Sequence, residues 1–130
     1  MTRKLDQIRA RQDAVQALGK PLARRSGRVC EICGDNSTAL RPAEVGPVED
    51  EPSLERTLLL CEACLPAVDN GDLTQRDDWR FIESAVWTET PAAQVSCVRI
   101  LRRLATDHHW ARATLEQLYL SPDVEAWLDG

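Results

Sequence analysis

The sequence has no long apolar run and few aromatic residues, with one Phe and one Tyr among 130 residues. Its start, MTRKLDQIRARQDAV, lacks the apolar segment of a secretory signal peptide. No stretch approaches the roughly 18 apolar residues that a membrane-spanning helix needs. We therefore expect a cytoplasmic protein with no membrane association. Thiols stay reduced in that compartment, so its cysteines are expected to bind metal rather than to form disulfides.

The composition is that of a small folded protein with an uneven charge. The length allows one domain, or a small metal module fused to a helical partner, and the 43% hydrophobic content indicates a folded core. Residues 1–30 carry eight basic and two acidic side chains, a formal charge of +6. The other 100 residues carry −11, which gives the formal −5 of the chain. The molecule therefore has a basic end and an acidic body.

Two Cys-x-x-Cys pairs dominate the sequence, Cys30 with Cys33 and Cys61 with Cys64, separated by 27 residues. Four thiolates brought together in two tight turns are a typical ligand set for a structural zinc ion. Gly34 follows the second cysteine, where a zinc knuckle needs a positive φ. The alternative, two reducible disulfides, requires an exported protein. We therefore predict a zinc site formed by these four cysteines.

The residues around the cysteines predict a β-hairpin followed by a short helix. Residues 38–42 and 57–60 are expected to be strands, joined by a loop rich in proline and acid at 46–53. Residues 65–68 can form a short helix closed by Asn70 and Gly71. If that helix forms, the knuckle, hairpin and ligand-bearing helix make a treble clef. If it does not, the same ligands make a zinc ribbon.

The N-terminal segment predicts one amphipathic helix and then a basic linker. Its narrow apolar stripe is expected to dock on the domain or on a second copy, and consists of Leu5, Ile8, Gln12, Val15 and Leu18. Gly19-Lys20-Pro21 should end the helix. Arg24, Arg25 and Arg28 then lead into the first knuckle, and they are candidates for partner binding. A solvated linker explains them equally well.

The C-terminal half is expected to be helical. Trp79, Ile82, Ala85 and Val86 recur at helical spacing, and Thr90-Pro91 predicts an N-cap and a first helical residue. The helix from there to Thr106 has an apolar arc and a basic arc. The apolar arc consists of Cys97, Val98, Leu101, Leu104 and Ala105. The basic arc consists of Arg99, Arg102 and Arg103. Cys97 is expected to be a buried small hydrophobe and not a fifth ligand.

Two more helices are expected before the end of the sequence. The first carries Trp110, Leu115, Leu118 and Tyr119, and Ser121-Pro122 starts the last one, which presents Val124, Trp127 and Leu128. The four tryptophans are expected to lie in the core rather than to stack on bases. His108 and His109 are interpreted as a surface loop, because adjacent side chains on a helix diverge and a metal site would need more ligands.

HNH-type nucleases resemble the region of the two cysteine pairs and the Leu-rich strand. Their chemistry depends on a histidine pair just after the first strand, which activates water and helps to hold a catalytic metal. Here that stretch reads Leu-Arg-Pro-Ala-Glu-Val and contains no histidine. Glu44 alone cannot supply both a metal site and a base, so nuclease activity is not expected.

A broader set of residues resembles the PhnA-like zinc-ribbon proteins of bacteria. The resemblance runs over about residues 25–128 and includes both cysteine pairs, the run from Trp79 to Val95, Arg99, Leu101, Arg103-Leu104, Trp110, residues 118–120 and Trp127. It implies a zinc site and a fold, but no activity. Members of that family commonly continue into a small SH3-like barrel, and we expect a PhnA-like protein that lacks it.

The sequence therefore predicts an α+β protein with three regions, 1–25, 26–72 and 73–130. The first is a basic amphipathic helix, the second is the four-cysteine zinc module and the third is helical. We expect a zinc-binding, non-enzymatic interaction or scaffold module. The alternatives are a nucleic-acid-associated zinc ribbon and a metal-dependent hydrolase related to HNH nucleases. A protein partner or self-association is favoured over nucleic acid, because the acidic body repels a phosphate backbone.

Overall fold

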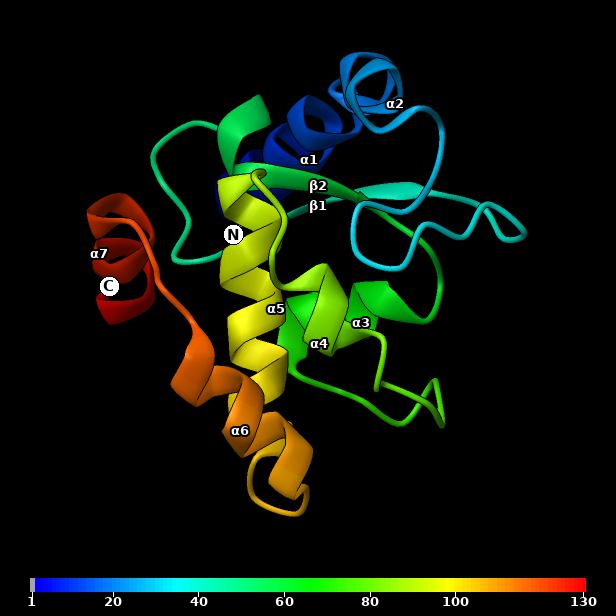
Figure 1. The fold of residues 1–130 in the computed structure, drawn as a ribbon. Coiled ribbons are helices and arrows are strands. Elements are labelled where there is room, and N and C mark those ends of the chain that lie inside the picture. Colours follow the sequence, from blue (N-terminus) through cyan, green and yellow to red (C-terminus); the bar gives the residue numbers. More distant parts are fainter. Residues whose placement is uncertain (1) are drawn as a thin grey trace.

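A two-stranded antiparallel hairpin and one central helix form the middle of the molecule, as Figure 1 shows. The structure is a computed structural model that describes residues 2–130. In chain order its elements are α1 (Thr2–Gln16), α2 (Gly19–Ser26), β1 (Arg41–Glu44), the 3-10 turn η1 (Leu54–Arg56), β2 (Thr57–Leu60), α3 (Cys64–Asn70), α4 (Ile82–Ala85), α5 (Pro91–Leu104), α6 (His109–Gln117) and α7 (Pro122–Asp129). Helices thus precede and follow a small hairpin, which confirms the predicted α+β class.

The hairpin pairs β1 with β2, with Arg41 opposite Leu60 and Glu44 opposite Thr57. All four residues of β2 are buried, which explains why its boundaries agree with the prediction from the Leu-rich run. The first strand was predicted at 38–42 and begins three residues later than expected. Its own sequence shows no clear alternation, and its position follows from pairing with β2. Pro42 is tolerated because each strand of a two-stranded sheet has a free edge.

The N-terminal segment differs most from the prediction. The predicted helix breaks at Gln16, and the Gly-Lys-Pro sequence expected to end it begins α2 instead. Proline is compatible with a first helical turn, where an N–H has no partner anyway. Leu22 of α2 is fully buried, whereas Leu5 and Ile8 of α1 are 58% and 47% exposed. The expected docking stripe is therefore exposed at these two residues.

A single arginine holds α1 on the hairpin. Arg11 donates from Nε and Nη2 to the two carboxylate oxygens of Glu44, at 2.9 and 2.7 Å. It also donates to the backbone carbonyls of Glu49 and Asp50, at 2.6 and 3.1 Å. These polar contacts, with the buried Val15, replace the apolar docking that the stripe predicted.

The helix α3 begins at the fourth cysteine of the two pairs, Cys64, and ends at Asn70. Gly71 follows with φ 74°, in the left-handed conformation, and its N–H donates to the carbonyl of Ala67. A glycine at this position ends a helix without the steric penalty of a side chain. The predicted ligand-bearing helix is thus present, and the knuckle, hairpin and helix have the order expected of a treble clef.

Figure 1 shows α5 between α3 and α4 on one side and α6 and α7 on the other. It starts at Pro91, as the Thr-Pro pair predicted, and its buried face includes Cys97, which is fully buried as expected. One cluster of buried residues joins the metal module to α5 and extends to Val124 of α7. The core therefore runs across the boundary predicted at residue 72.

One tryptophan expected in the core is exposed, and Tyr119 lies outside the helix on which it was expected. Trp79 is buried, but the predicted helix around it shrinks to the short α4, and Trp87 beyond its end is 51% exposed. Tyr119 lies past the end of α6 and is 93% exposed. The helical spacing that placed these two residues on helices applies only where each helix continues. Within residues 2–130, no helix combines the length and apolar character needed to cross a membrane.

The last helix, α7, begins as predicted and packs back on the hairpin loop. The Ser121 hydroxyl accepts a hydrogen bond from the Val124 N–H at 3.3 Å, which confirms the predicted N-cap. Trp127 donates from its indole Nε1 to the carbonyl of Gly46 at 3.1 Å. The Arg56 guanidinium lies 4.2 Å from the centre of the Trp127 ring. The stacked Arg56 guanidinium and the indole hydrogen bond to Gly46 thus attach α7 to the segment between the strands.

Candidate metal centre

The four predicted cysteines come together at one point. The sulfur atoms of Cys30, Cys33, Cys61 and Cys64 all lie within 4.8 Å of one another, and those of Cys33 and Cys61 are 3.6 Å apart. A tetrahedral zinc with Zn–S bonds of about 2.3 Å places its sulfurs about 3.8 Å apart. The donor set and spacing therefore fit a metal ion of this kind, and these four residues can hold one.

The first knuckle is a tight turn built by backbone hydrogen bonds. The Cys30 N–H donates to the carbonyl of Asp35, and the Gly34 N–H donates back to the carbonyl of Cys30, both at 2.9 Å. The Ile32 N–H points at the Cys30 sulfur, 3.4 Å away. Gly34 has φ 79°, which confirms the positive φ expected after the second ligand. The turn thus presents both sulfurs on one side.

Glu31, between the first two cysteines, attaches the knuckle to the hairpin. Its N–H donates to the carbonyl of Leu59, and its Oε1 accepts from the Leu59 N–H, both at 2.9 Å. Its two carboxylate oxygens also receive Nε and Nη2 of Arg25, at 2.9 and 2.8 Å. Arg25 donates further to the carbonyls of Leu54 and Thr57, both at 2.7 Å. The first ligand pair is therefore fixed to β2, which leads to the second pair.

The second pair lies at the junction of β2 and α3. Cys61 follows the last residue of β2, and Cys64 is the first residue of α3. The Leu65 N–H donates to the Cys61 carbonyl at 3.0 Å, and the Glu62 N–H donates to the Thr38 hydroxyl at 3.3 Å. The buried strand and the helix start thus position these two sulfurs.

The surroundings of the sulfurs favour the ionised form at Cys30 and the neutral form at Cys33 and Cys64, because burial raises the pKa of Cys33 and the hydrogen bond with Cys30 raises the pKa of Cys64. The pKa of Cys30 is lowered to about 5, first because it shares a hydrogen bond with the Cys64 thiol, and against the opposing effect of burial. For the Arg76 guanidinium, burial lowers the pKa, but the negative charge of Cys33 and Cys64 outweighs it and the pKa is raised. Four thiolates around a divalent ion carry a net charge of −2, so a nearby arginine offsets part of that charge.

The structure divides the three arginines predicted to bind a partner. Arg24 and Arg28 are exposed, and within the described chain neither side chain forms a hydrogen bond or an ion pair. Arg25 is committed to Glu31 and to two carbonyls beside the knuckle. Arg25 thus supports the metal module internally, and partner binding remains a prediction for Arg24 and Arg28.

The residues considered for hydrolytic chemistry, Glu44, His108 and His109, do not form a common site. Both carboxylate oxygens of Glu44 are occupied by Arg11. His108 precedes α6 and His109 is its first residue, and both are exposed. Across residues 2–130, the four cysteines are the only group of three or more His, Cys, Asp or Glu side chains close enough to hold a metal ion.

The roles of three residues near the four cysteines were missed from the sequence. Glu31 and Arg76 were not singled out, and the internal contacts of Arg25 were not predicted. Glu31 could have been noticed from its place between two ligands. The contacts of Arg25 reach residues 54 and 57, and those of Arg76 depend on how the chain folds back after α3. No local sequence pattern reports such distant pairings.

Comparisons of the chain with protein-family models, with curated proteins and with solved structures found no match. The site is therefore interpreted from its own geometry.

Proposed function

We propose that this chain is a small cytoplasmic binding protein, without enzymatic activity, whose fold is held by a structural zinc ion. One observation carries the proposal: four sulfurs converge in a closed site, and three of their cysteines, Cys30, Cys61 and Cys64, are buried in the core. Structural zinc sites have four protein ligands, whereas catalytic sites keep a position for water. The reduced state of all five cysteines agrees with a cytoplasmic location.

The hydrolase alternative has little support in the positions that would serve it. Glu44 is the one acid in the segment where HNH nucleases carry histidine, and Arg11 neutralises it through a bidentate contact. Both oxygens of this carboxylate accept charge-assisted hydrogen bonds from one guanidinium, so neither faces a substrate or a water molecule as a general base must.

The partner that we propose is a protein, and a second copy of the chain is the one that the charges favour. Residues 1–30 carry +6 and the remainder carries −11, so the basic end of one copy can meet the acidic body of another. Arg24 and Arg28 are exposed on the basic end, and Leu5 and Ile8 add exposed apolar surface to it. Nucleic acid is the alternative partner, favoured by the same arginines and opposed by the acidic body.

We also propose that the chain is related to the PhnA-like zinc-ribbon proteins. The support is the set of residues from Arg25 to Trp127 given above, together with four clustered cysteines and a hairpin of the expected kind. This relationship concerns the fold and the zinc, and it assigns no reaction.

The experiment is sedimentation of the zinc-loaded protein across a salt series, for the wild type and for the double variant Arg24→Gln/Arg28→Gln. Charge-driven self-association predicts a dimer at low salt that dissociates as salt rises and is weakened in the double variant. Arg99→Gln/Arg102→Gln is the matched control, because it removes the same charge elsewhere. A monomer at every salt and protein concentration would contradict self-association.

Oligonucleotide binding, measured on the same samples, separates the two partner classes. Micromolar binding at physiological salt, with a steep log–log salt dependence that is reduced in Arg24→Gln/Arg28→Gln, would favour nucleic acid over protein.

A further inference from the structure

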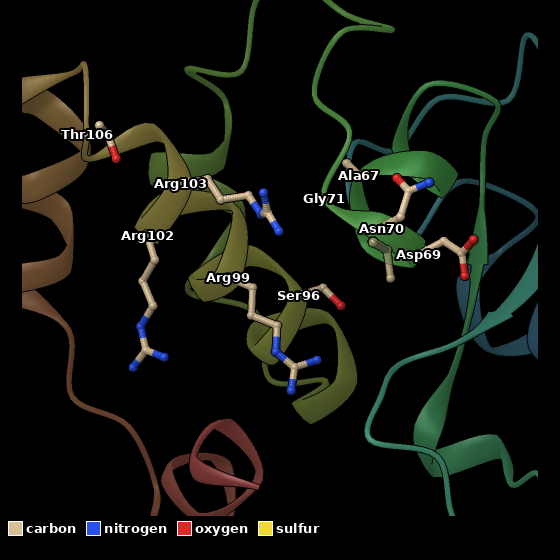
Figure 2. Close-up of a pocket in the computed structure, with 10 residues that line it drawn as sticks. Ala67, Asp69, Asn70, Gly71, Ser96, Arg99, Arg102, Arg103 and Thr106 are labelled. Carbon is tan, nitrogen blue, oxygen red and sulfur yellow. The ribbon is translucent and has the colours of Figure 1, made fainter.

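A pocket of about 570 Å³ lies between α3 and α5 (Figure 2), and none of the four clustered cysteines lines it. Residues 67–71 of α3 and its end form one wall. The other wall comes from α5 and the residue two positions after it, and consists of Ser96, Arg99, Arg102, Arg103 and Thr106. Its volume lies within the range of about 300–1,000 Å³ that is typical of small-molecule sites.

Three arginines share this wall because of their spacing on the helix. Positions 99, 102 and 103 differ by three and four residues, which places them on one face of α5. None of the three side chains forms a hydrogen bond or ion pair within residues 2–130. By contrast, Arg11, Arg25, Arg56 and Arg80 each pair with a glutamate. In a chain of formal charge −5, three arginines without an ion pair thus line one pocket.

Arg99 lies among other positive charges. It is half-buried, and its pKa is lowered first by burial and then by the charges of Arg102 and Arg56. Asp69 is the carboxylate on the opposite wall, and it is exposed and pairs with none of the three arginines. A bound anion would relieve both the loss of hydration and the repulsion between the guanidinium groups.

Arg103 has a different role from the other two. Figure 2 shows it pointing toward Gly71, while Arg99 and Arg102, which line the same pocket, point in a different direction. Its guanidinium packs so closely on Gly71 that a side chain at that position would collide with it. Gly71 ends α3, where carbonyl groups and the helix dipole attract a cation. Arg99 and Arg102 are therefore the arginines left for a ligand.

We propose that this pocket binds a small anion bearing a phosphate or diphosphate group, through Arg99 and Arg102. Guanidinium groups match phosphate oxygens with paired, charge-assisted hydrogen bonds. The concave shape and the Asp69 carboxylate favour a compact ligand over an extended polyanion, whose further phosphates would meet the acidic body. The site uses other residues than the proposed protein interface, so either proposal can fail alone.

The test is calorimetric titration of the zinc-loaded protein with inorganic pyrophosphate and, separately, with ADP, at constant ionic strength set by sodium chloride. Saturable binding of one equivalent is expected for at least one probe, and the two arms distinguish free phosphate from a nucleotide. Arg99→Gln/Arg102→Gln should weaken that binding at least about tenfold, because each charge-assisted hydrogen bond lost has at least that effect.

The matched control is Arg24→Gln/Arg28→Gln, which removes the same charge from the basic end and should bind within about twofold of the wild type. Arg102→Gln alone, at an exposed position, serves if the double variant loses zinc or helix content. Absence of saturable binding by both probes would overturn the proposal. So would an equal loss in both double variants, or tight binding of a single-stranded oligonucleotide in place of the two small probes.

Discussion

The guanidinium of Arg25 donates to both carboxylate oxygens of Glu31, at 2.9 and 2.8 Å. Glu31 lies between the first two cysteines, and its side chain is only 5% exposed. Arg25 belongs to α2, Glu31 to the knuckle, and the same arginine reaches carbonyls at residues 54 and 57. One side chain therefore connects the N-terminal helices, the metal module and the start of β2.

We expect Arg25→Ala to destabilise the protein by about 1–3 kcal/mol, because it leaves a nearly buried carboxylate without its charged partner. Arg25→Lys should recover only part of this loss, since an ammonium cannot form the paired contact. Urea denaturation of the zinc-loaded proteins measures the effect. Arg24→Ala, at an exposed neighbour, should change the unfolding free energy by less than about 0.5 kcal/mol. Equal effects at positions 24 and 25 would show that the Glu31 contact contributes nothing.

The purified protein should contain one zinc ion per chain. Cys33→Ser and Cys61→Ser should each lose both metal and folded structure, because binding of a structural zinc contributes directly to folding. Elemental analysis and circular dichroism on protein expressed with ample zinc measure the two effects. Cys97→Ala is the matched control and should keep its zinc. A metal-free wild type, or a native disulfide within either pair, would contradict the assignment.

We expect no hydrolysis of DNA, RNA or phosphonates in the presence of magnesium, manganese or zinc. A zinc ion with four thiolate ligands has no position for water, and Glu44 is occupied by Arg11. Prolonged incubation with labelled substrates measures this. Turnover that is present in the wild type and absent in Glu44→Gln would revive the hydrolase hypothesis.

Cys97 should resist alkylation in the folded protein. Burial, and then the charge at Cys30, raise the pKa of its thiol to about 12 from an ordinary value of 9.0. Folding thus favours the neutral thiol. The stability that this pKa shift contributes is complete below about pH 9 and is lost as the pH rises toward 12. Mass spectrometry after iodoacetamide treatment at pH 8 should find Cys97 unmodified.

The same pKa shift predicts a difference in alkaline unfolding. Between about pH 9 and 12, Cys97→Ala should lose less stability than the wild type, because it has no thiol to ionise. Rapid alkylation of Cys97 under native conditions, or identical pH dependence of the two proteins, would contradict this.

The convergence of the four cysteines and several element boundaries were predictable because their signals are local. The spacing of the cysteines is itself the ligand geometry, and the Leu-rich run, Thr90-Pro91 and Ser121-Pro122 each specify a strand or a helix start through neighbouring residues. Gly34 and Gly71 were predictable for the same reason, since each serves a turn within a few residues of itself.

The remainder depended on contacts between distant segments. Leu5 and Ile8 have helical spacing, but whether a partner surface covers them is decided by where Arg11 attaches α1. Trp87 was expected in the core and Tyr119 on a helix, but α4 and α6 end before these residues. The pairing of Arg25 with Glu31 and the arginine pocket of α5 likewise follow only from the folded chain.

The buried cluster that includes Cys30, Cys61 and Cys64 also includes residues of α5, α6 and α7. Because the two halves share one core, they should unfold together, in a single cooperative transition rather than in two steps. Removal of a bound metal would then destabilise the helical half as well as the knuckles. If the four cysteines hold the zinc that we propose, the zinc supply of the cell would control how much folded protein is present, and not merely whether one site is filled.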